Sequence, residues 1–314
     1  MAAQHAPAEF GRLLTAMVTP MRAGGEVNDD ACAELARALI ASGSDGLVVT
    51  GTTGESPTLT ADEQVRTWRT VKEAVGPDVA VLAGATGNDT ARSIEMAREA
   101  ERIGCDGLLP TVPSYNRPTQ EGLVRHFTAI AEATSLPGML YNVPGRTALN
   151  MTAETTVRLS RVPNIVGVKE ASGDLQQVSR IIMDAEPGFR VWSGNDADTL
   201  PILALGGYGV VSVVAHLVGR QVREMVAASV AGSNERAAEI HRRLAPLVDA
   251  MFVESNPIPT KFALNEIGFP AGEPRLPLLP ASESAAATIR AELARQQIDL
   301  PVTPALSPPL SPPR

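Results

Sequence analysis

The chain is poor in the residues that build metal centres, disulfide frameworks and membrane spans. Its 314 residues include two cysteines and four histidines, scattered without the spacing of metal ligands or of a disulfide framework. We therefore predict no metal site, and we expect Cys32 and Cys105 to be reduced core thiols. The longest apolar run, around residues 210–218, is too short to cross a bilayer and contains His216. The sequence thus predicts a protein without a membrane span.

Positive charge is also in short supply. The chain has 27 Lys and Arg against 35 Asp and Glu, a formal net charge of -8 and a sequence pI of about 5.2. Nucleic acids and anionic membranes attract basic surfaces, so this balance argues against both as partners. The first ten residues contain no basic segment followed by an apolar one, so we expect no signal peptide and a cytoplasmic location.

What the sequence does contain is a regular alternation of short apolar runs and helical patterns. The eight runs cover residues 13–18, 46–49, 79–83, 107–109, 138–141, 165–169, 189–192 and 209–213. The helical patterns that follow them cover residues 29–42, 60–75, 89–103, 120–133, 152–159, 175–184, 198–205 and 220–231. Such alternation is typical of parallel βα units, and its count and length predict an α/β fold, a (β/α)₈ TIM barrel, over residues 1–232. A doubly wound open sheet is the alternative, although no G-x-G-x-x-G follows the first run.

Strand signals cease after the barrel. A C-terminal region, residues 233–299, is predicted to hold three helices, over 234–253, 257–267 and 282–297. Residues 300–314 are rich in proline, and we expect an extended or disordered tail. Its PxxP spacing leaves open a second interpretation, a ligand for a domain that binds polyproline helices.

Polar side chains gather where the predicted strands end, which is where barrel enzymes place their chemistry. Lys169 ends the sixth run, and burial there would disfavour its charged form and make the amine a nucleophile. A strand-end lysine that extends its amine to solvent is the structural alternative. The other strand ends and the loops after them carry Thr52, Thr53, Tyr115, Tyr141, Arg146, Gly194 and Asn195.

These residue types suit one kind of reaction. A desolvated lysine can condense with a ketone to a Schiff base without any cofactor, and hydroxyl groups can then move protons. The sequence GTTGE and Arg146 offer hydroxyls, backbone N–H groups and a guanidinium to carboxylates. Each element also has a purely structural interpretation: a glycine turn, a tyrosine capping the core, an exposed aromatic. Their coincidence at one barrel face favours a catalytic site.

Five stretches, in order, resemble the dihydrodipicolinate synthase family of pyruvate-dependent class I aldolases and lyases. They are GTTGESPT (51–58), SYNRPTQEG (114–122), YNVPGRT (141–147), GVKEASGD (167–174) and NPIPTK (256–261). The match extends from about residue 10 to about residue 298. The resemblance implies condensation of pyruvate with aspartate semialdehyde to 4-hydroxy-tetrahydrodipicolinate, towards diaminopimelate and lysine, by a homotetramer built as a dimer of dimers.

The resemblance also implies roles for individual residues. Lys169 would form the imine with pyruvate. A proton relay would consist of Thr53, Tyr141 and Tyr115, with Tyr115 reaching into the site of a neighbouring subunit. The carboxylate and pyruvate contacts would come from Thr52, Thr53, Gly194 and Val211, and Arg146 would bind the carboxylate of the semialdehyde.

The chain departs from the family at positions that belong to a lysine-feedback site in regulated members. Ser114 precedes Tyr115 where many members have two adjacent tyrosines, and Ala61 and Gln64 stand where some regulated enzymes carry histidines. Arg92 replaces a glutamate, and its charge would repel the ammonium group of lysine. We therefore predict an enzyme that is insensitive or only weakly sensitive to lysine.

Rival interpretations remain open. Within the family they are lyases for sialic acid, 2-keto-3-deoxy sugar acids or 4-hydroxy-2-oxoglutarate, which usually lack the arginine at position 146. Outside it, the chain could be a non-catalytic barrel that only binds a keto acid. A phosphate-binding barrel would need a glycine-rich loop after the seventh or eighth strand, whereas residues 206–209 precede the eighth and indicate a helix-to-strand turn.

Overall fold

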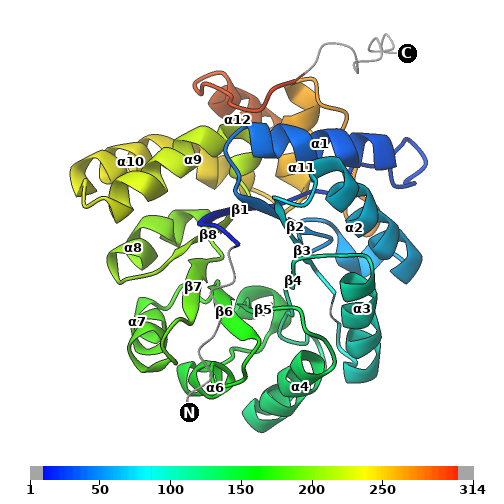
Figure 1. Cartoon of the computed structure of the whole chain (residues 1–314). Coiled ribbons are helices and arrows are strands. Elements are labelled where there is room, and N and C mark those ends of the chain that lie inside the picture. Colours follow the sequence, from blue (N-terminus) through cyan, green and yellow to red (C-terminus); the bar gives the residue numbers. More distant parts are fainter. Residues whose placement is uncertain (1–9, 86, 303–314) are drawn as a thin grey trace.

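Eight parallel strands close into a barrel in the computed structural model, which describes residues 10–85 and 87–302. The strands pair in sequence order, and β8 pairs with β1 (Figure 1). They are β1 Leu13–Ala16, β2 Gly46–Val49, β3 Ala80–Ala83, β4 Gly107–Leu108, β5 Gly138–Asn142, β6 Ile165–Glu170, β7 Arg190–Ser193 and β8 Gly209–Ser212. The predicted TIM barrel is confirmed, and the open-sheet alternative is wrong.

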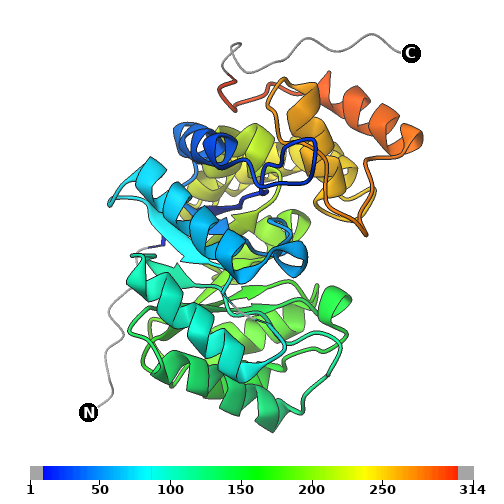
Figure 2. The same cartoon turned by 90° about the vertical axis from the view of Figure 1, so that its right-hand side faces the viewer.

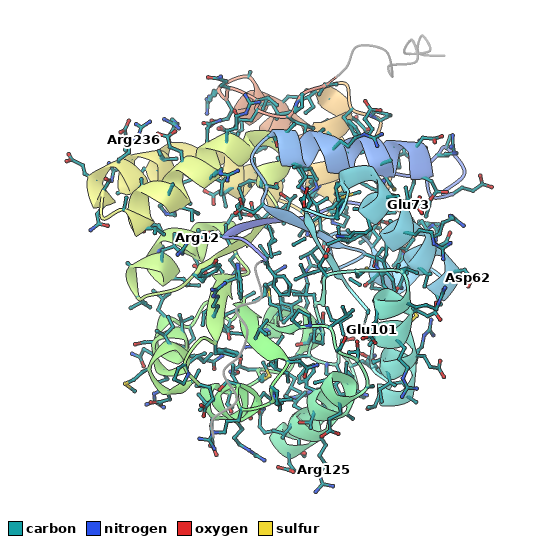
Figure 3. The ribbon with its side chains drawn as sticks, in the orientation of Figure 1. Arg12, Asp62, Glu73, Glu101, Arg125 and Arg236 are labelled. Carbon is teal, nitrogen blue, oxygen red and sulfur yellow. The ribbon has the colours of Figure 1, made fainter. Side chains whose placement is uncertain are left out.

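Helices surround the barrel, one or more after each strand (Figure 1). They are α1 Asp29–Ala41, α2 Ala61–Val75, α3 Thr90–Arg102, α4 Gln120–Glu132, α5 Pro144–Thr147, α6 Ala153–Leu159, α7 Leu175–Asp184, α8 Thr199–Ala204 and α9 Ala215–Val230, with 3-10 turns η1 Ser56–Thr58 and η2 Asp196–Asp198. Labelled charged side chains on this outer ring, such as Asp62, Glu73 and Arg125, are exposed (Figure 3).

Two of the helices show where local patterns succeed and fail. The helix predicted over residues 60–75 is present as α2 and begins with a capping box: Thr60 accepts from the backbone N–H of Glu63, and the Glu63 side chain accepts from the backbone N–H of Thr60. Helix α9 begins at Ala215, five residues before the predicted start, and Val218 inside it has non-helical φ/ψ of -129° and 40°. The extra turn follows β8 closely, and its apolar residues Ala215, Leu217 and Val218 are buried.

Apolar side chains form an inner and an outer layer. The inner layer fills the barrel with residues such as Leu14, Val48, Leu82, Met139, Tyr141, Trp192 and Val211. The outer layer lies between strands and helices and contains both free cysteines, whose pKa burial raises to about 12.

At the N-terminal end of the barrel, Tyr208 lies between the guanidinium groups of Arg12 and Arg190, at 4.2 and 4.1 Å from its ring centroid. Residues 206–209 form the predicted helix-to-strand turn, with Gly206 at φ +101°.

The C-terminal helices lie on one side of the barrel, beside α1 and α9 (Figures 1 and 2). They are α10 Asn234–Met251, α11 Ile258–Glu266 and α12 Glu283–Leu293, so the predicted three-helix region is present. Leu300, placed in the tail by the sequence analysis, is buried, and residues 303–314 of the tail lie outside the described residues. None of the described helices is long and apolar enough to cross a membrane.

Candidate active site

Lys169 and Tyr141 lie side by side at the C-terminal end of the barrel. They are register partners on β6 and β5, and the Lys169 Nζ atom lies 4.1 Å from the centroid of the Tyr141 ring. Both side chains are 5% exposed. Strand β6 ends one residue later than predicted, at Glu170, so Lys169 is held within the strand and its amine is enclosed rather than extended to solvent.

The surroundings of Lys169 favour a neutral amine. Burial lowers its pKa to about 7, because a charged amine loses its hydration there. The negative charge of Asp196 opposes this shift, and the positive charge of Arg146 adds to it. At neutral pH a large fraction of the amine is therefore unprotonated and able to act as a nucleophile.

A buried polar network on the outer side of the same strands holds this pair in register. Glu170 accepts hydrogen bonds from Asn142 Nδ2 at 3.0 Å, from the backbone N–H of Ser172 at 2.8 Å and from Gln177 Nε2 at 3.2 Å. Asn142 and Glu170 are register partners one residue beyond Tyr141 and Lys169. Burial raises the pKa of Glu170, and these hydrogen bonds oppose the rise.

The loop after β2 brings two threonines to the barrel mouth. Its backbone is left-handed at Thr50 (φ 52°) and Glu55 (φ 60°), and a Cβ on the neighbouring Gly84 would lie 2.4 Å from the Thr50 carbonyl oxygen. The close approach is thus possible only for glycine. Thr53 is buried and Thr52 is half-buried.

Tyr141 is kept neutral beside these threonines. Burial raises the pKa of its phenol to about 12, while the charge of Arg146 and a hydrogen bond with Thr52 partly counter the rise. A phenol that is neutral at pH 7 can donate its proton to a substrate. It can then take up another proton from a neighbouring hydroxyl group. Thr52, Tyr141 and Lys169 therefore offer a nucleophile with hydroxyl groups close to it.

Arg146 comes from α5, a single helical turn that is not among the predicted helices. The guanidinium Nη2 donates to the backbone carbonyl oxygen of Asn256 at 3.3 Å. Arg146 and Thr52 line a cavity of about 640 Å³. The same cavity is lined by Gln64, Arg92 and Ser114, three of the positions that the resemblance assigned to feedback by lysine.

The remaining predicted residues lie in different places. A Cβ on Gly194 would lie 2.7 Å from Ala171 Cβ and 3.2 Å from Lys169 Cγ, so only glycine fits beside the lysine. Val211 is buried in the inner layer with Tyr141. Tyr115, in contrast, is 93% exposed at φ +66° and is not brought to Lys169 within one chain.

The structure adds two polar residues that the sequence analysis missed. Asp196 follows β7 and accepts hydrogen bonds from the Ser212 hydroxyl and from the backbone N–H groups of Val213 and Val214. Asn256 precedes α11, and its Nδ2 atom donates to Thr53 Oγ1 at 2.8 Å. Asp196 could have been found from its place just after Asn195 at a strand end. Asn256 lies in the C-terminal region, where the strand-end argument does not apply.

The set can form an imine, move protons through hydroxyl groups and bind carboxylates. No group of three or more His, Cys, Asp or Glu side chains that could hold a metal ion occurs within residues 10–85 and 87–302.

Comparison with known proteins supports the resemblance carried by the five motifs. The model of the Dihydrodipicolinate synthetase family matches residues 9–296. A 4-hydroxy-tetrahydrodipicolinate synthase of Dehalococcoides mccartyi is 54% identical over 94% of this chain and 99% of its own. One of Moorella thermoacetica is 54% identical over 91% of this chain and 98% of its own. The crystal structure of DHDPS from Cyanidioschyzon merolae with lysine bound superposes with a TM-score of 0.90 at 48% identity, covering 91% of this chain and 97% of that one.

Proposed function

Because the chain belongs to the dihydrodipicolinate synthetase family, we propose that it condenses pyruvate with L-aspartate 4-semialdehyde to 4-hydroxy-tetrahydrodipicolinate. This is the activity of a Schiff-base-forming lyase of the class I aldolase type, on the route to diaminopimelate and lysine. The observation that carries the proposal is the buried Lys169 amine, whose pKa of about 7 makes it a nucleophile near neutral pH. Cytoplasmic location is part of the proposal, in keeping with two free cysteines.

The reaction uses the chain's own groups and needs no cofactor. The lone pair of Lys169 Nζ attacks the keto carbon of pyruvate, and loss of water leaves an imine. Loss of a methyl proton gives an enamine, whose carbon attacks the aldehyde carbon of the semialdehyde while the aldehyde oxygen takes up a proton. The amine of the semialdehyde then attacks the imine carbon and displaces Lys169, which closes the ring and frees the enzyme.

The proton transfers belong to Thr53, Tyr141 and Tyr115, and the carboxylates have separate holders. Thr52 and Thr53 bind the pyruvate carboxylate, and Gly194 and Val211 line the space for its methyl and keto groups. Arg146 binds the carboxylate of the semialdehyde through its fork of N–H donors. Its place in one cavity with Thr52 supports this division.

Trapping with borohydride tests the imine. The chain has only three lysines, Lys72, Lys169 and Lys261, so an adduct can be located by mass analysis with two internal controls. We expect reduction in the presence of pyruvate to modify Lys169 alone. An unmodified Lys169 in a folded protein would refute the proposed mechanism.

Substrate assays separate this activity from that of other members of the family. We expect condensation with aspartate semialdehyde and no cleavage of sialic acid or keto-deoxy sugar acids. Arg146→Ala should raise KM for the semialdehyde by at least about 10-fold while imine formation with pyruvate persists. Arg146→Lys is the matched control, which retains the charge and loses the fork. Equal loss of both functions in Arg146→Ala would make the arginine structural.

Tyr115 is proposed to complete the site of a second copy in a homotetramer built as a dimer of dimers. An aromatic side chain that is 93% exposed on a left-handed backbone is costly in an isolated chain. Its loop is nevertheless held in place, since Asn88 accepts from the Ser114 backbone N–H at 3.0 Å and from Asn116 Nδ2 at 3.0 Å. The phenol is thus presented to a partner on an anchored loop.

Mixing two inactive variants tests the shared site. Tyr115→Phe and Lys169→Ala should each be nearly inactive alone, but subunit exchange should create hybrid sites with both wild-type groups and restore part of the activity. Sedimentation of the wild type should give a tetramer. No recovery in a mixture shown to exchange subunits would place Tyr115 outside the partner's site.

Insensitivity to lysine is also part of the proposal. Arg92 and Arg146 line the same cavity. Their two positive charges would repel the ammonium groups of a lysine molecule that entered it. We expect steady-state activity to persist at millimolar lysine, and Arg92→Glu to create inhibition where the wild type has none. Half-inhibition of the wild type by sub-millimolar lysine would refute this part.

A further inference from the structure

Asn256 joins the C-terminal helical region to two residues of the barrel mouth. It is 6% exposed and lies two residues before the start of α11. Its Nδ2 atom donates to Thr53 Oγ1 at 2.8 Å, and its backbone carbonyl oxygen accepts from Arg146 Nη2 at 3.3 Å. One residue thus contacts a member of the proton relay and the residue that binds the second substrate.

A hydrogen bond to the amide oxygen of Asn256 fixes the orientation of its side chain. The Thr260 hydroxyl, one turn along α11, donates to Asn256 Oδ1 at 3.4 Å. With the amide oxygen engaged there, the amide NH₂ group faces Thr53. The Thr53 hydroxyl accepts a hydrogen bond from the Asn256 NH₂ group, which offers no acceptor in return. The Thr53 hydroxyl proton must therefore point away from Asn256.

The same helix holds the loop that carries Thr53 at a second point. Lys261 Nζ lies 2.6 Å from Glu55 Oε1, and both side chains are 1% exposed. Glu55 is two residues after Thr53, and Lys261 is five residues after Asn256. Two contacts between one loop and one helix fix the position of the threonine as well as the direction of its hydroxyl group.

We propose that Asn256 is a positioning residue that directs the Thr53 hydroxyl proton into the site and steadies Arg146. The inference rests on the proposed function, because it assigns a direction to the relay that the condensation needs. It predicts that what matters at position 256 is a hydrogen-bond donor: an acceptor there would take the Thr53 proton for itself and withdraw the hydroxyl from the relay.

The test compares Asn256→Asp, which replaces the donor by an acceptor of the same shape, with Asn256→Ala. Asn265→Ala is the matched control, because Asn265 lies on the same helix and its Nδ2 bonds to the Gly272 carbonyl, away from the site. Each protein is measured for unfolding, for trapping of pyruvate by borohydride, and for kcat and KM with both substrates across pH.

We expect both Asn256 variants to form the pyruvate imine. The value of kcat should fall about 10-fold in Asn256→Ala and about 100-fold in Asn256→Asp, because loss of a positioning residue removes only part of the roughly 10²–10⁴-fold that a positioned proton-transfer group contributes. The activity of Asn256→Asp relative to wild type should recover as pH falls, since a protonated carboxyl group donates again. KM for the semialdehyde should rise a few-fold, and Asn265→Ala should match the wild type.

A double variant distinguishes loss of the Asn256–Thr53 hydrogen bond from a general effect of misfolding. Thr53→Val removes the hydroxyl group, so adding Asn256→Ala to it should lower kcat little further. The milder change Thr260→Val removes the hydrogen bond to the Asn256 amide oxygen and should lower kcat a few-fold. Wild-type-like kcat in folded Asn256 variants, or additive losses with Thr53→Val and no pH recovery, would overturn the positioning role. Failure of the wild type itself to form an imine would instead overturn the proposed function, and the positioning role with it.

Discussion

Lys169 and Lys261 are both buried, yet their electrostatic surroundings differ. Lys261 lies under α11 with its Nζ atom 2.6 Å from Glu55 Oε1, and it also donates to the Glu273 carbonyl oxygen at 3.1 Å. Lys169 makes no ion pair among the residues that the structure describes, and its amine rests on the Tyr141 ring. Burial lowers the pKa of both amines, and the paired carboxylate opposes this for Lys261.

The difference fits the roles proposed for the two lysines, Lys169 as the nucleophile and Lys261 as part of a structural ion pair. A paired and hydrogen-bonded amine keeps its proton and is not a nucleophile. The negative charge of Asp196 favours protonation of Lys169, but this carboxylate already accepts hydrogen bonds from Ser212 and two backbone N–H groups. Burial without an ion pair therefore favours the neutral form of the Lys169 amine, the form that the proposed mechanism needs.

Replacing the unpaired lysine should have the largest effect on activity and little effect on stability. Lys169→Met should abolish the pyruvate adduct and reduce condensation by at least about 10³-fold. The free energy of unfolding should stay the same or rise, because the change removes a buried amine without an ion-pair partner. Steady-state kinetics and urea denaturation measure the two effects. A loss of stability as large as that of Lys261→Met would break the comparison.

Replacing the paired lysine should mainly affect stability. Lys261→Met leaves the Glu55 carboxylate buried without its counter-ion, so the free energy of unfolding should fall by about 3 kcal/mol. The control is the double variant Lys261→Met with Glu55→Gln, which removes both charges and should recover much of the loss. Urea denaturation of the three proteins measures this, and simply additive losses would contradict a coupled pair.

The Asp196 carboxylate should tune the amine of Lys169 over a smaller range. In the wild type the rate of imine formation should rise with pH through a midpoint of about 7, because the neutral amine predominates above its pKa. Asp196→Asn removes a charge that favours the protonated form, so the midpoint should move to lower pH. Asp198→Asn, which changes a carboxylate bound to Asn195, is the control. A midpoint that moves to higher pH would contradict the assigned influence of Asp196.

The smallest effect is expected for a more accessible ion pair that ties the same C-terminal region to α2. Hydrogen bonding to Arg275 lowers the pKa of Glu63 from 4.5 to about 2. Its contribution to stability is full above pH 4.5 and is lost as pH falls towards 2, because the unfolded chain binds the proton first. Glu63→Gln should therefore flatten stability over this pH range, as followed by thermal unfolding. An unchanged pH dependence would show that other carboxylates account for it.

Several elements could be read from local patterns because their physical cause is local. Helix α7, Leu175–Asp184, has its predicted bounds, since Asp174 caps it by accepting from the backbone N–H groups of Gln176 and Gln177. Helix α5 was not among the predicted helices, and α9 begins five residues before its predicted start. Both consist of a few residues next to a strand end, where chain packing rather than periodicity sets the backbone.

The candidate site divides in the same way. Strand-end positions predict that Lys169, Tyr141 and Thr52 lie close together, because parallel strands in a barrel end on one face, and the structure brings these three together. Asn256 could not be predicted in this way, because it belongs to the C-terminal helical region and is 203 residues away from Thr53 in the sequence.

The sequence by itself determined the barrel, through its eight apolar runs, and identified Lys169 as the amine at the end of the sixth. Only the tertiary structure decided that this amine is buried without a close counter-ion, whereas Lys261 meets Glu55. The physical reason is range: strand formation depends on neighbouring residues, but the pKa of a lysine depends on charges that folding brings from distant parts of the chain.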